Sequence, residues 1–169
     1  LGALDAGVSQ RAQAAIAEGF EVLKLKVGMA PVGHELALLR QLADDLPIGI
    51  LLRLDANRAW NMADAQRFIT GMAGLPLEML EEPLAQPDLT DLATLQAQTE
   101  IPLALDESLP ELGLERVLAT IPVQRMVLKP MITGGLQAAL KTAQGAHEAG
   151  MTCVVTTSVD SAVGTLAAL

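Results

Sequence analysis

The chain has 169 residues, of which 51% are hydrophobic and 2% aromatic, and its formal net charge is −9. This length suits one domain, and the apolar share can form a sizeable core. The acidic balance argues against nucleic-acid binding, where a basic patch is expected. No apolar run reaches the ~18 residues of a membrane span, so we expect no membrane insertion.

Apolar runs of strand length alternate with helix-like stretches along the chain. Strands are expected within residues 20–28, 48–57, 75–83, 101–108, 123–130 and 151–158. Helices are expected at residues 8–18, 32–46, 62–73, 88–98, 112–119 and 135–149, with a further one starting near Ser161. Strict alternation of this kind predicts an α/β fold with a parallel sheet.

Charged or polar side chains lie near the C-terminal end of each predicted strand. They are Lys24 and Lys26, Asp55, Glu81, Asp106, Lys129, and then Thr156 and Ser158. From Lys26 to Lys129 they follow one another at steps of 23 to 29 residues, about one βα unit each. In a (β/α)₈ barrel the C-terminal strand ends converge on one mouth, which holds the active site. The regular repetition therefore predicts part of a TIM (β/α)₈ barrel rather than a doubly wound sheet.

The stretch LRLDANRAW (residues 52–60) shows how these polar groups are oriented. Leu52, Leu54 and Ala56 alternate with Arg53, Asp55 and Asn57. Since successive side chains of a strand point to opposite faces, one face is apolar and the other polar. We expect the polar face to line the inside of the barrel.

Three carboxylates on successive strand ends form a hard oxygen-ligand site. Asp55, Glu81 and Asp106 would suit Mg²⁺, with Mn²⁺ as an alternative. The two histidines, His34 and His147, fall in helix-like stretches, and we expect both on the surface rather than in a zinc site.

Lysines flank the carboxylates in sequence. Lys24 and Lys26 share one face of their strand, and Lys129 follows the last carboxylate by one unit. In a closed barrel the two lysine-bearing strands lie roughly opposite each other. A lysine acts as a general base only when its pKa is lowered towards neutrality, and a neighbouring cation, a metal ion and a dry pocket all have this effect.

Five motifs, in this order and spacing, resemble the enolase superfamily: LKLKVG, LRLDANRAW, LEEP, LDES and VLKP. The pattern K-x-K, Asp, Glu, Asp and Lys is similar to its muconate-lactonizing-enzyme-like subgroup. Within that subgroup, LRLDANRAW, KPMITGG and TTSVDSAVG are most similar to the o-succinylbenzoate synthases of menaquinone and phylloquinone biosynthesis. The resemblance runs through nearly all of the chain.

The resemblance implies a role for each matching residue. Asp55, Glu81 and Asp106 match the Mg²⁺ ligands, with the first glutamate of EEP as the ligand. Lys26 matches the catalytic acid/base, which Lys24 would tune. Lys129 matches a lysine whose charge stabilises an enolate from the opposite face.

Substrate-binding positions follow from the same resemblance. Arg53 and Asn57 would support the site from the inward face. Gly134 and Gly135 would let a backbone turn approach it closely, although an ordinary helix N-terminus explains them equally well. Thr156, Thr157 and Ser158 match a segment near the carboxylates of the substrate.

The implied reaction is dehydration of 2-succinyl-6-hydroxy-2,4-cyclohexadiene-1-carboxylate to 2-succinylbenzoate. Lys26 would remove the proton next to the ring carboxylate to give an enediolate held by Mg²⁺, and would return a proton to the departing hydroxide. The expected partner is a small carboxylate, and the oligomeric state stays open. The lone cysteine, Cys153, fits a reducing cytoplasm and is expected to be a buried thiol.

The chain is short for this family, because a full barrel takes ~250 residues. The six expected strands match the second to the seventh, so residues 1–169 would form an incomplete barrel domain. The first strand, the eighth strand and the N-terminal capping domain would be missing, and the start without Met indicates an excerpt or a processed chain.

Two alternatives stay open at this point. In the first, the chain belongs to a dipeptide epimerase or an N-succinylamino acid racemase, in which Lys26 and Lys129 act as bases on opposite faces. In the second, it is a non-catalytic barrel fragment that serves as a binding module.

Overall fold

A computed structural model describes residues 1–158 and 165–166, and the helix expected near Ser161 lies outside them. The strands are β1 (Gly2–Ala3), β2 (Val22–Lys26), β3 (Leu51–Asp55), β4 (Leu77–Glu81), β5 (Leu103–Leu105), β6 (Arg125–Leu128) and β7 (Thr152–Val155). The helices are α1 (Val8–Ala17), α2 (Val32–Asp45), α3 (Met62–Gly71), α4 (Leu89–Gln96), α5 (Leu109–Leu112), α6 (Leu114–Thr120), α7 (Pro130–Thr133) and α8 (Leu136–Glu148).

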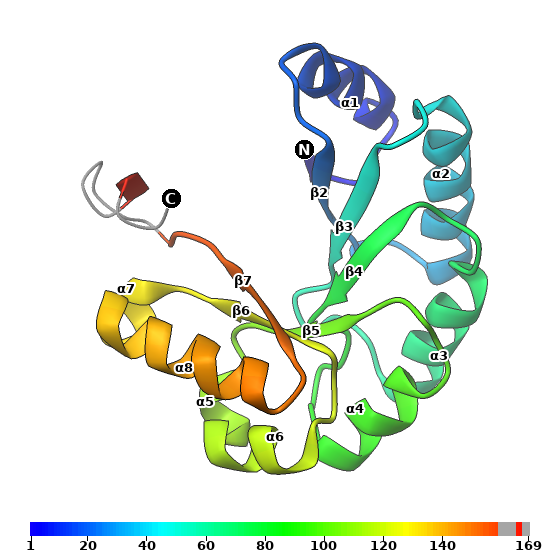
Figure 1. The fold of residues 1–169 in the computed structure, drawn as a ribbon. Helices are drawn as coiled ribbons and strands as arrows, with labels where there is room; N and C mark the ends of the chain where they lie inside the picture. Colours follow the sequence, from blue (N-terminus) through cyan, green and yellow to red (C-terminus); the bar gives the residue numbers. More distant parts are fainter. Residues whose placement is uncertain (159–164, 167–169) are drawn as a thin grey trace.

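The strands of the described residues form one parallel sheet in chain order, from β1 to β7. Figure 1 shows the curved sheet with the helices along its outer side. A doubly wound sheet would reverse its strand order partway. The sequential order is instead that of a partial (β/α)₈ barrel, which confirms the predicted fold class, and the described part of the chain contains no capping domain.

The structure differs from the expectation in three elements. The short strand β1 pairs with β2 through Gly2 and Ala3, so the first strand is partly present. The helix expected at residues 112–119 is α6, which begins at Leu114, and the short helix α5 before it was not predicted; Gly113, with φ +83°, separates the two. The short helix α7 follows β6 directly and was not predicted.

The core lies mainly between the sheet and the helices. Leu23, Leu25, Leu52 and Leu54 are almost fully buried on this outer side of β2 and β3. A smaller cluster on the inner side consists of Met79, Ala104 and Val127, with Val154 packed against it. The leucines of each strand therefore hold the helices, while the alternate positions are left for the barrel interior.

Three residues predicted to be buried or exposed can be placed directly. Both histidines, His34 and His147, are exposed, as expected. Cys153 is half-buried rather than fully buried, because β7 has only one neighbouring strand among the described residues. No helix of the described residues has the length and apolar character needed to cross a bilayer.

An ion-pair network crosses the inner face of the sheet below the strand ends. The register between β3 and β4 shifts after Leu52, which makes Glu78 an extra residue in β4. The Glu78 carboxylate pairs with Arg53 at 2.7 Å and with Arg125 at 2.8 Å. Hydrogen bonds from Arg53 and Arg125 hold the pKa of Glu78 below its ordinary value, although partial burial opposes this. Arg53, predicted to support the substrate site, is thus engaged in a structural ion pair.

We expect Glu78→Gln to lower the free energy of unfolding at pH 7 by about 1–3 kcal/mol, as for lost hydrogen bonds between charged groups. Because the folded-state pKa of Glu78 is depressed, its contribution is present above the unfolded pKa and is lost as the pH falls. The difference between the two proteins should therefore shrink below about pH 4.5. Urea unfolding of the intact gene product between pH 7 and pH 3 measures this, with exposed Glu115→Gln as the control. A difference that does not change with pH would contradict it.

The unpaired edges of the two outer strands bear on whether residues 1–169 associate when isolated. Among the described residues, β1 and β7 each have a single neighbour, and unpaired edges promote association. Leu136, Leu140 and Val155 are exposed on α8 and β7. We therefore expect the isolated chain to associate or to unfold without a sharp transition. Analytical ultracentrifugation and a circular dichroism melt test this, and a cooperatively melting monomer would contradict it.

Candidate active site

Strand register brings the predicted site residues to one end of the sheet. Lys26 lies opposite Asp55, and Asp55 lies opposite Glu81 in the β2–β3 and β3–β4 pairs. Asp106 and Lys129 directly follow β5 and β6, the next two strands. Residues separated by about one βα unit in sequence therefore meet at the C-terminal ends of the strands, where (β/α)₈ barrels carry their active sites.

Lys24 connects two of the predicted metal ligands. Its Nζ lies 2.9 Å from Asp55 Oδ2 and 2.8 Å from Glu81 Oε2. Although burial lowers the pKa of Lys24, the contacts with Glu81 and Asp55 outweigh it and raise that pKa. Lys24 therefore carries a positive charge that compensates two carboxylates whose side chains are almost fully buried.

Glu81 is the most perturbed carboxylate of the site. Burial raises its pKa to about 7, and the negative charge of Asp55 and a side-chain contact with Asp106 add to this effect, while Lys24 opposes it. The residue has 0% of its surface exposed, and its buried Oε1 has no hydrogen-bond partner among the residues that the structure describes. A buried oxygen without a partner is rare in folded proteins, and a bound ion is one explanation for it.

Glu81 belongs to a compact group of carboxylates with Asp106 and Glu107. One oxygen from each of the three lies within 4.8 Å of the others. Around Mg²⁺, ligands at about 2.1 Å put neighbouring oxygens about 3 Å apart and opposite ones about 4.2 Å apart. The three carboxylates would need only small side-chain adjustments to reach these separations, and the buried Glu81 oxygen offers a ligand atom for a divalent cation. Asp55 lies outside this group and is joined to it through Lys24.

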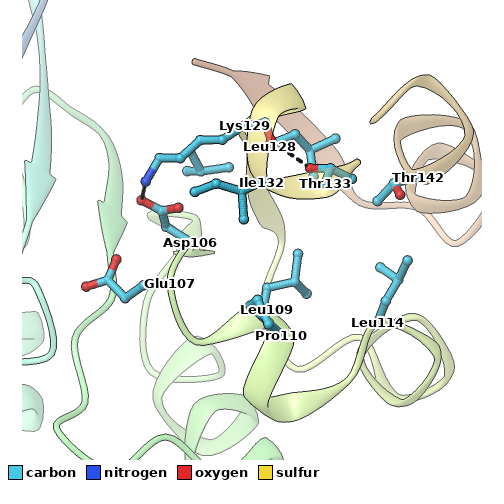
Figure 2. A pocket seen from close by; sticks show the side chains of 11 residues that line it. Asp106, Glu107, Leu109, Pro110, Leu114, Leu128, Lys129, Ile132, Thr133 and Thr142 are labelled. Atoms are coloured by element: carbon cyan, nitrogen blue, oxygen red, sulfur yellow. Dashed lines mark hydrogen bonds and ion pairs between the residues drawn. The ribbon is translucent and has the colours of Figure 1, made fainter. Parts of the chain in front are cut away.

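Two further lysines lie on either side of the carboxylates. Lys129 forms an ion pair and hydrogen bond with Asp106, which Figure 2 shows beside Glu107. Lys26 Nζ donates to Asn57 Oδ1 at 2.6 Å, and Asn57 Nδ2 donates to Glu107 Oε1 at 3.4 Å. Since β2 and β6 flank β3 to β5 in the sheet, Lys26 and Lys129 approach the carboxylates from two sides.

A pocket of about 330 Å³ lies between the segments that follow β5 and β6, and residues of α5, α6, α7 and α8 contribute to its lining. Asp106 and Lys129 lie at one end of it, and Leu109, Leu114 and Ile132 supply apolar walls (Figure 2). Pockets for small molecules combine an apolar lining with a few polar groups in this way. The pocket suits a ligand with an apolar part and a charged part.

The other residues predicted to bind substrate are dispersed. Gly134 and Gly135 link α7 to α8 with φ of +103° and +104°, conformations that favour glycine. Thr156 continues the pairing of β7, because its N–H donates to the Leu128 carbonyl at 2.9 Å. Thr157 is half-buried and Ser158 is exposed, and residues 159–164 of the TTSVDSAVG motif lie outside the described part of the chain.

Periodicity does not single out Glu107, a further carboxylate of the site, because it stands directly beside Asp106. Two buried glutamates that hold loops were not predicted either. Glu35 and Glu82 are each 1% exposed and accept hydrogen bonds from loops after strands. The two carboxylate oxygens of Glu35 accept hydrogen bonds from the backbone N–H groups of Gly28, Met29 and Ala30, contacts that sequence spacing does not reveal.

Comparison with known proteins identifies the family to which this chain is similar. A model of the enolase C-terminal domain-like family matches residues 7–169. The o-succinylbenzoate synthase of Desulfotalea psychrophila is 32% identical over 161 residues, which cover 93% of this chain and 44% of that protein. The L-Ala-D/L-Glu epimerase of Bacillus subtilis is 32% identical over 155 residues, or 89% of this chain and 42% of that protein. The chain therefore spans less than half the length of these curated relatives.

A solved structure supports the same relationship. The dipeptide epimerase of Enterococcus faecalis, complexed with Mg and the dipeptide L-Leu-L-Tyr, is similar with a TM-score of 0.85 and 31% identity. The similarity covers 95% of this chain and 46% of that one.

We expect Lys24→Met to destabilise the intact gene product most strongly when no divalent cation is present. Removing one partner of a fully buried ion pair costs about 3–5 kcal/mol. Since the Lys24 side chain is 44% exposed, we expect a smaller loss of about 1–3 kcal/mol. If a cation binds the same carboxylates, about 10 mM Mg²⁺ should restore more of the loss than it adds to the unchanged protein. Thermal melts with Mg²⁺ and with a chelator test this, with exposed Lys141→Met as the control. Equal losses in both buffers would contradict it.

Proposed function

The chain belongs to the enolase C-terminal domain-like family, and on that premise we propose that it is part of a Mg²⁺-dependent enzyme that removes a proton next to a substrate carboxylate. Residues 1–169 would form an incomplete barrel domain of this enzyme. The observation that carries the proposal is the buried Glu81 oxygen, to which no described residue donates a hydrogen bond, within a group of carboxylates that Lys26 and Lys129 flank from two sides.

Asp55, Glu81 and Asp106 would hold the metal, and the arrangement also offers Glu107. Mg²⁺ bound there would supply positive charge that stabilises the negative charge developing on the substrate carboxylate. The donor set contains only carboxylates, which suits a hard cation such as Mg²⁺ or Mn²⁺. The relative complexed with Mg supports this choice.

Lys26 would be the general base, and its unprotonated Nζ would take the proton. Asn57 would hold this Nζ in place, because its Oδ1 accepts from Lys26 at 2.6 Å while its Nδ2 donates to Glu107 at 3.4 Å. Lys129, which pairs with Asp106, would place its charge on the other side of the substrate. Lys24 would compensate Asp55 and Glu81.

As the reaction we propose dehydration of 2-succinyl-6-hydroxy-2,4-cyclohexadiene-1-carboxylate to 2-succinylbenzoate. The similarity to an o-succinylbenzoate synthase and the motifs LRLDANRAW, KPMITGG and TTSVDSAVG support it. Lys26 would take the proton next to the ring carboxylate and then return a proton to the departing hydroxide, so that water leaves and the ring becomes aromatic. The enzyme would act in menaquinone or phylloquinone biosynthesis in the cytoplasm, where a lone cysteine stays reduced.

The second candidate is epimerisation of a dipeptide or racemisation of an N-succinylamino acid. The similarity to the L-Ala-D/L-Glu epimerase of Bacillus subtilis supports it. The placement of Lys26 and Lys129 on two sides of the carboxylates also favours it, because inversion needs a proton removed from one face and delivered to the other. Both candidates share the first step, in which a lysine takes a proton next to a carboxylate.

We expect the intact gene product with Mg²⁺ to form 2-succinylbenzoate, followed by ultraviolet absorbance. Lys26→Ala should lower the rate by about 10²–10⁴-fold, as expected for loss of a general acid/base. Exposed Lys141→Ala serves as the control and should keep the rate.

The same preparation distinguishes the alternatives. Deuterium exchange at the α-carbon of dipeptides or N-succinylamino acids, without dehydration, would replace the synthase with an epimerase or racemase. A folded protein that binds Mg²⁺ and does neither would favour a non-catalytic binding module.

A further inference from the structure

Glu82 is a buried carboxylate that points away from the candidate metal site. Its neighbour Glu81 faces Lys24, whereas the Glu82 side chain reaches the loop after β5. One oxygen, Oε1, accepts three hydrogen bonds: from the Asp106 N–H at 2.5 Å, the Ser108 N–H at 3.0 Å and the Ser108 Oγ at 2.7 Å. Both Glu82 and Ser108 are almost fully buried. This single oxygen therefore holds both ends of the Asp106–Glu107–Ser108 turn.

The backbone of Glu82 forms hydrogen bonds with two neighbouring segments, β5 and the loop after β3. Its N–H donates to the Ala104 carbonyl of β5 at 3.0 Å, and its carbonyl accepts from the Arg58 N–H at 2.7 Å. Arg58 lies three residues after Asp55, in the loop that follows β3. Glu82 itself has φ +48°, a conformation that non-glycine residues adopt only where the surroundings impose it.

Together these contacts connect Glu82 to the segments that carry all three predicted metal ligands. It follows Glu81 directly, its carbonyl holds the loop that begins at Asp55, and its side chain holds the N–H of Asp106. We propose that Glu82 is a positioning residue that sets the separations of Asp55, Glu81 and Asp106, and so controls metal affinity. This inference rests on the proposed function, because it assumes that these carboxylates bind the metal.

The consequence of removing the side chain follows from its three donors. In Glu82→Ala, two N–H groups and one hydroxyl would lose their acceptor in a buried region, which is unfavourable unless the turn moves to find water. Movement of the turn would displace Asp106 and Glu107 from Glu81. Residues that orient metal ligands in this way typically contribute 10–100-fold to metal affinity. Glu82→Gln keeps an oxygen acceptor at this position, so it should retain the turn.

Glu35 provides a matched control of the same chemical kind. It is also a buried glutamate, and it also accepts three hydrogen bonds from a loop after a strand. Its donors are Gly28, Met29 and Ala30, and none of the three predicted ligands belongs to this loop. Glu35→Ala should therefore destabilise the protein without moving the carboxylates.

The experiment measures Mn²⁺ binding to the intact gene product by electron paramagnetic resonance, together with the melting temperature of each variant. We expect the dissociation constant to rise about 10- to 100-fold in Glu82→Ala and to stay within about 3-fold in Glu82→Gln and Glu35→Ala. Both alanine variants should melt at lower temperature. Binding is measured well below these melting temperatures, so that loss of stability alone does not change the dissociation constant.

Two outcomes would overturn the inference. One is an unchanged dissociation constant in folded Glu82→Ala, and the other is an equal rise in Glu35→Ala. If Glu82→Ala does not fold, Ser108→Ala decides, because it removes one of the three donors; a several-fold weaker binding is expected, and unchanged binding would refute the role. If the unchanged protein binds no Mn²⁺ and no Mg²⁺, the proposed function fails and this inference fails with it.

Discussion

Burying several carboxylates at one place is the constraint on which the rest of the site depends. Like charges in a region of low dielectric repel one another, so each carboxylate needs a cation or a hydrogen-bond donor nearby. Lys24 forms ion pairs with Asp55 and Glu81, and Lys129 forms one with Asp106. Within the described part of the chain, one Glu81 oxygen still lacks a hydrogen-bond partner, and burial raises the pKa of this residue to about 7.

The sheet separates an apolar outer face from a charged inner face, which allows the carboxylates to be buried. Outward leucines bury against the helices and stabilise the sheet, which leaves inward positions free for charged groups. Along the inner face, the Glu78 network and the apolar cluster around Met79 and Val127 lie below the carboxylates. Charged groups therefore lie both at the strand ends and lower on the inner face of the sheet. Strand pairing fixes the distance between these two groups of charges.

Hydrogen bonds also order the loops that follow the strand ends. Glu35 and Glu82 each satisfy three donors of a loop, and the parallel pairing of β3 and β4 continues to a bridge between Trp60 and Leu84. A synthase and an epimerase both match this part of the chain at 32% identity, so the same scaffold occurs in relatives with different reactions.

Local patterns in the sequence were sufficient to determine the alternating strands and helices, the parallel sheet and the polar strand ends. Periodicity is a property of neighbouring residues, so Asp55, Glu81 and Asp106 could be predicted at strand termini without knowing their contacts. The short helix α5 before Gly113, the pairing of β1 and the short helix α7 depended on backbone conformation and packing. Only the tertiary structure decided that Glu81 faces Lys24 while Glu82 holds the next loop, and that Glu107 joins the carboxylates. These relations connect residues more than 20 positions apart, and they are set by strand register and loop closure rather than by local sequence.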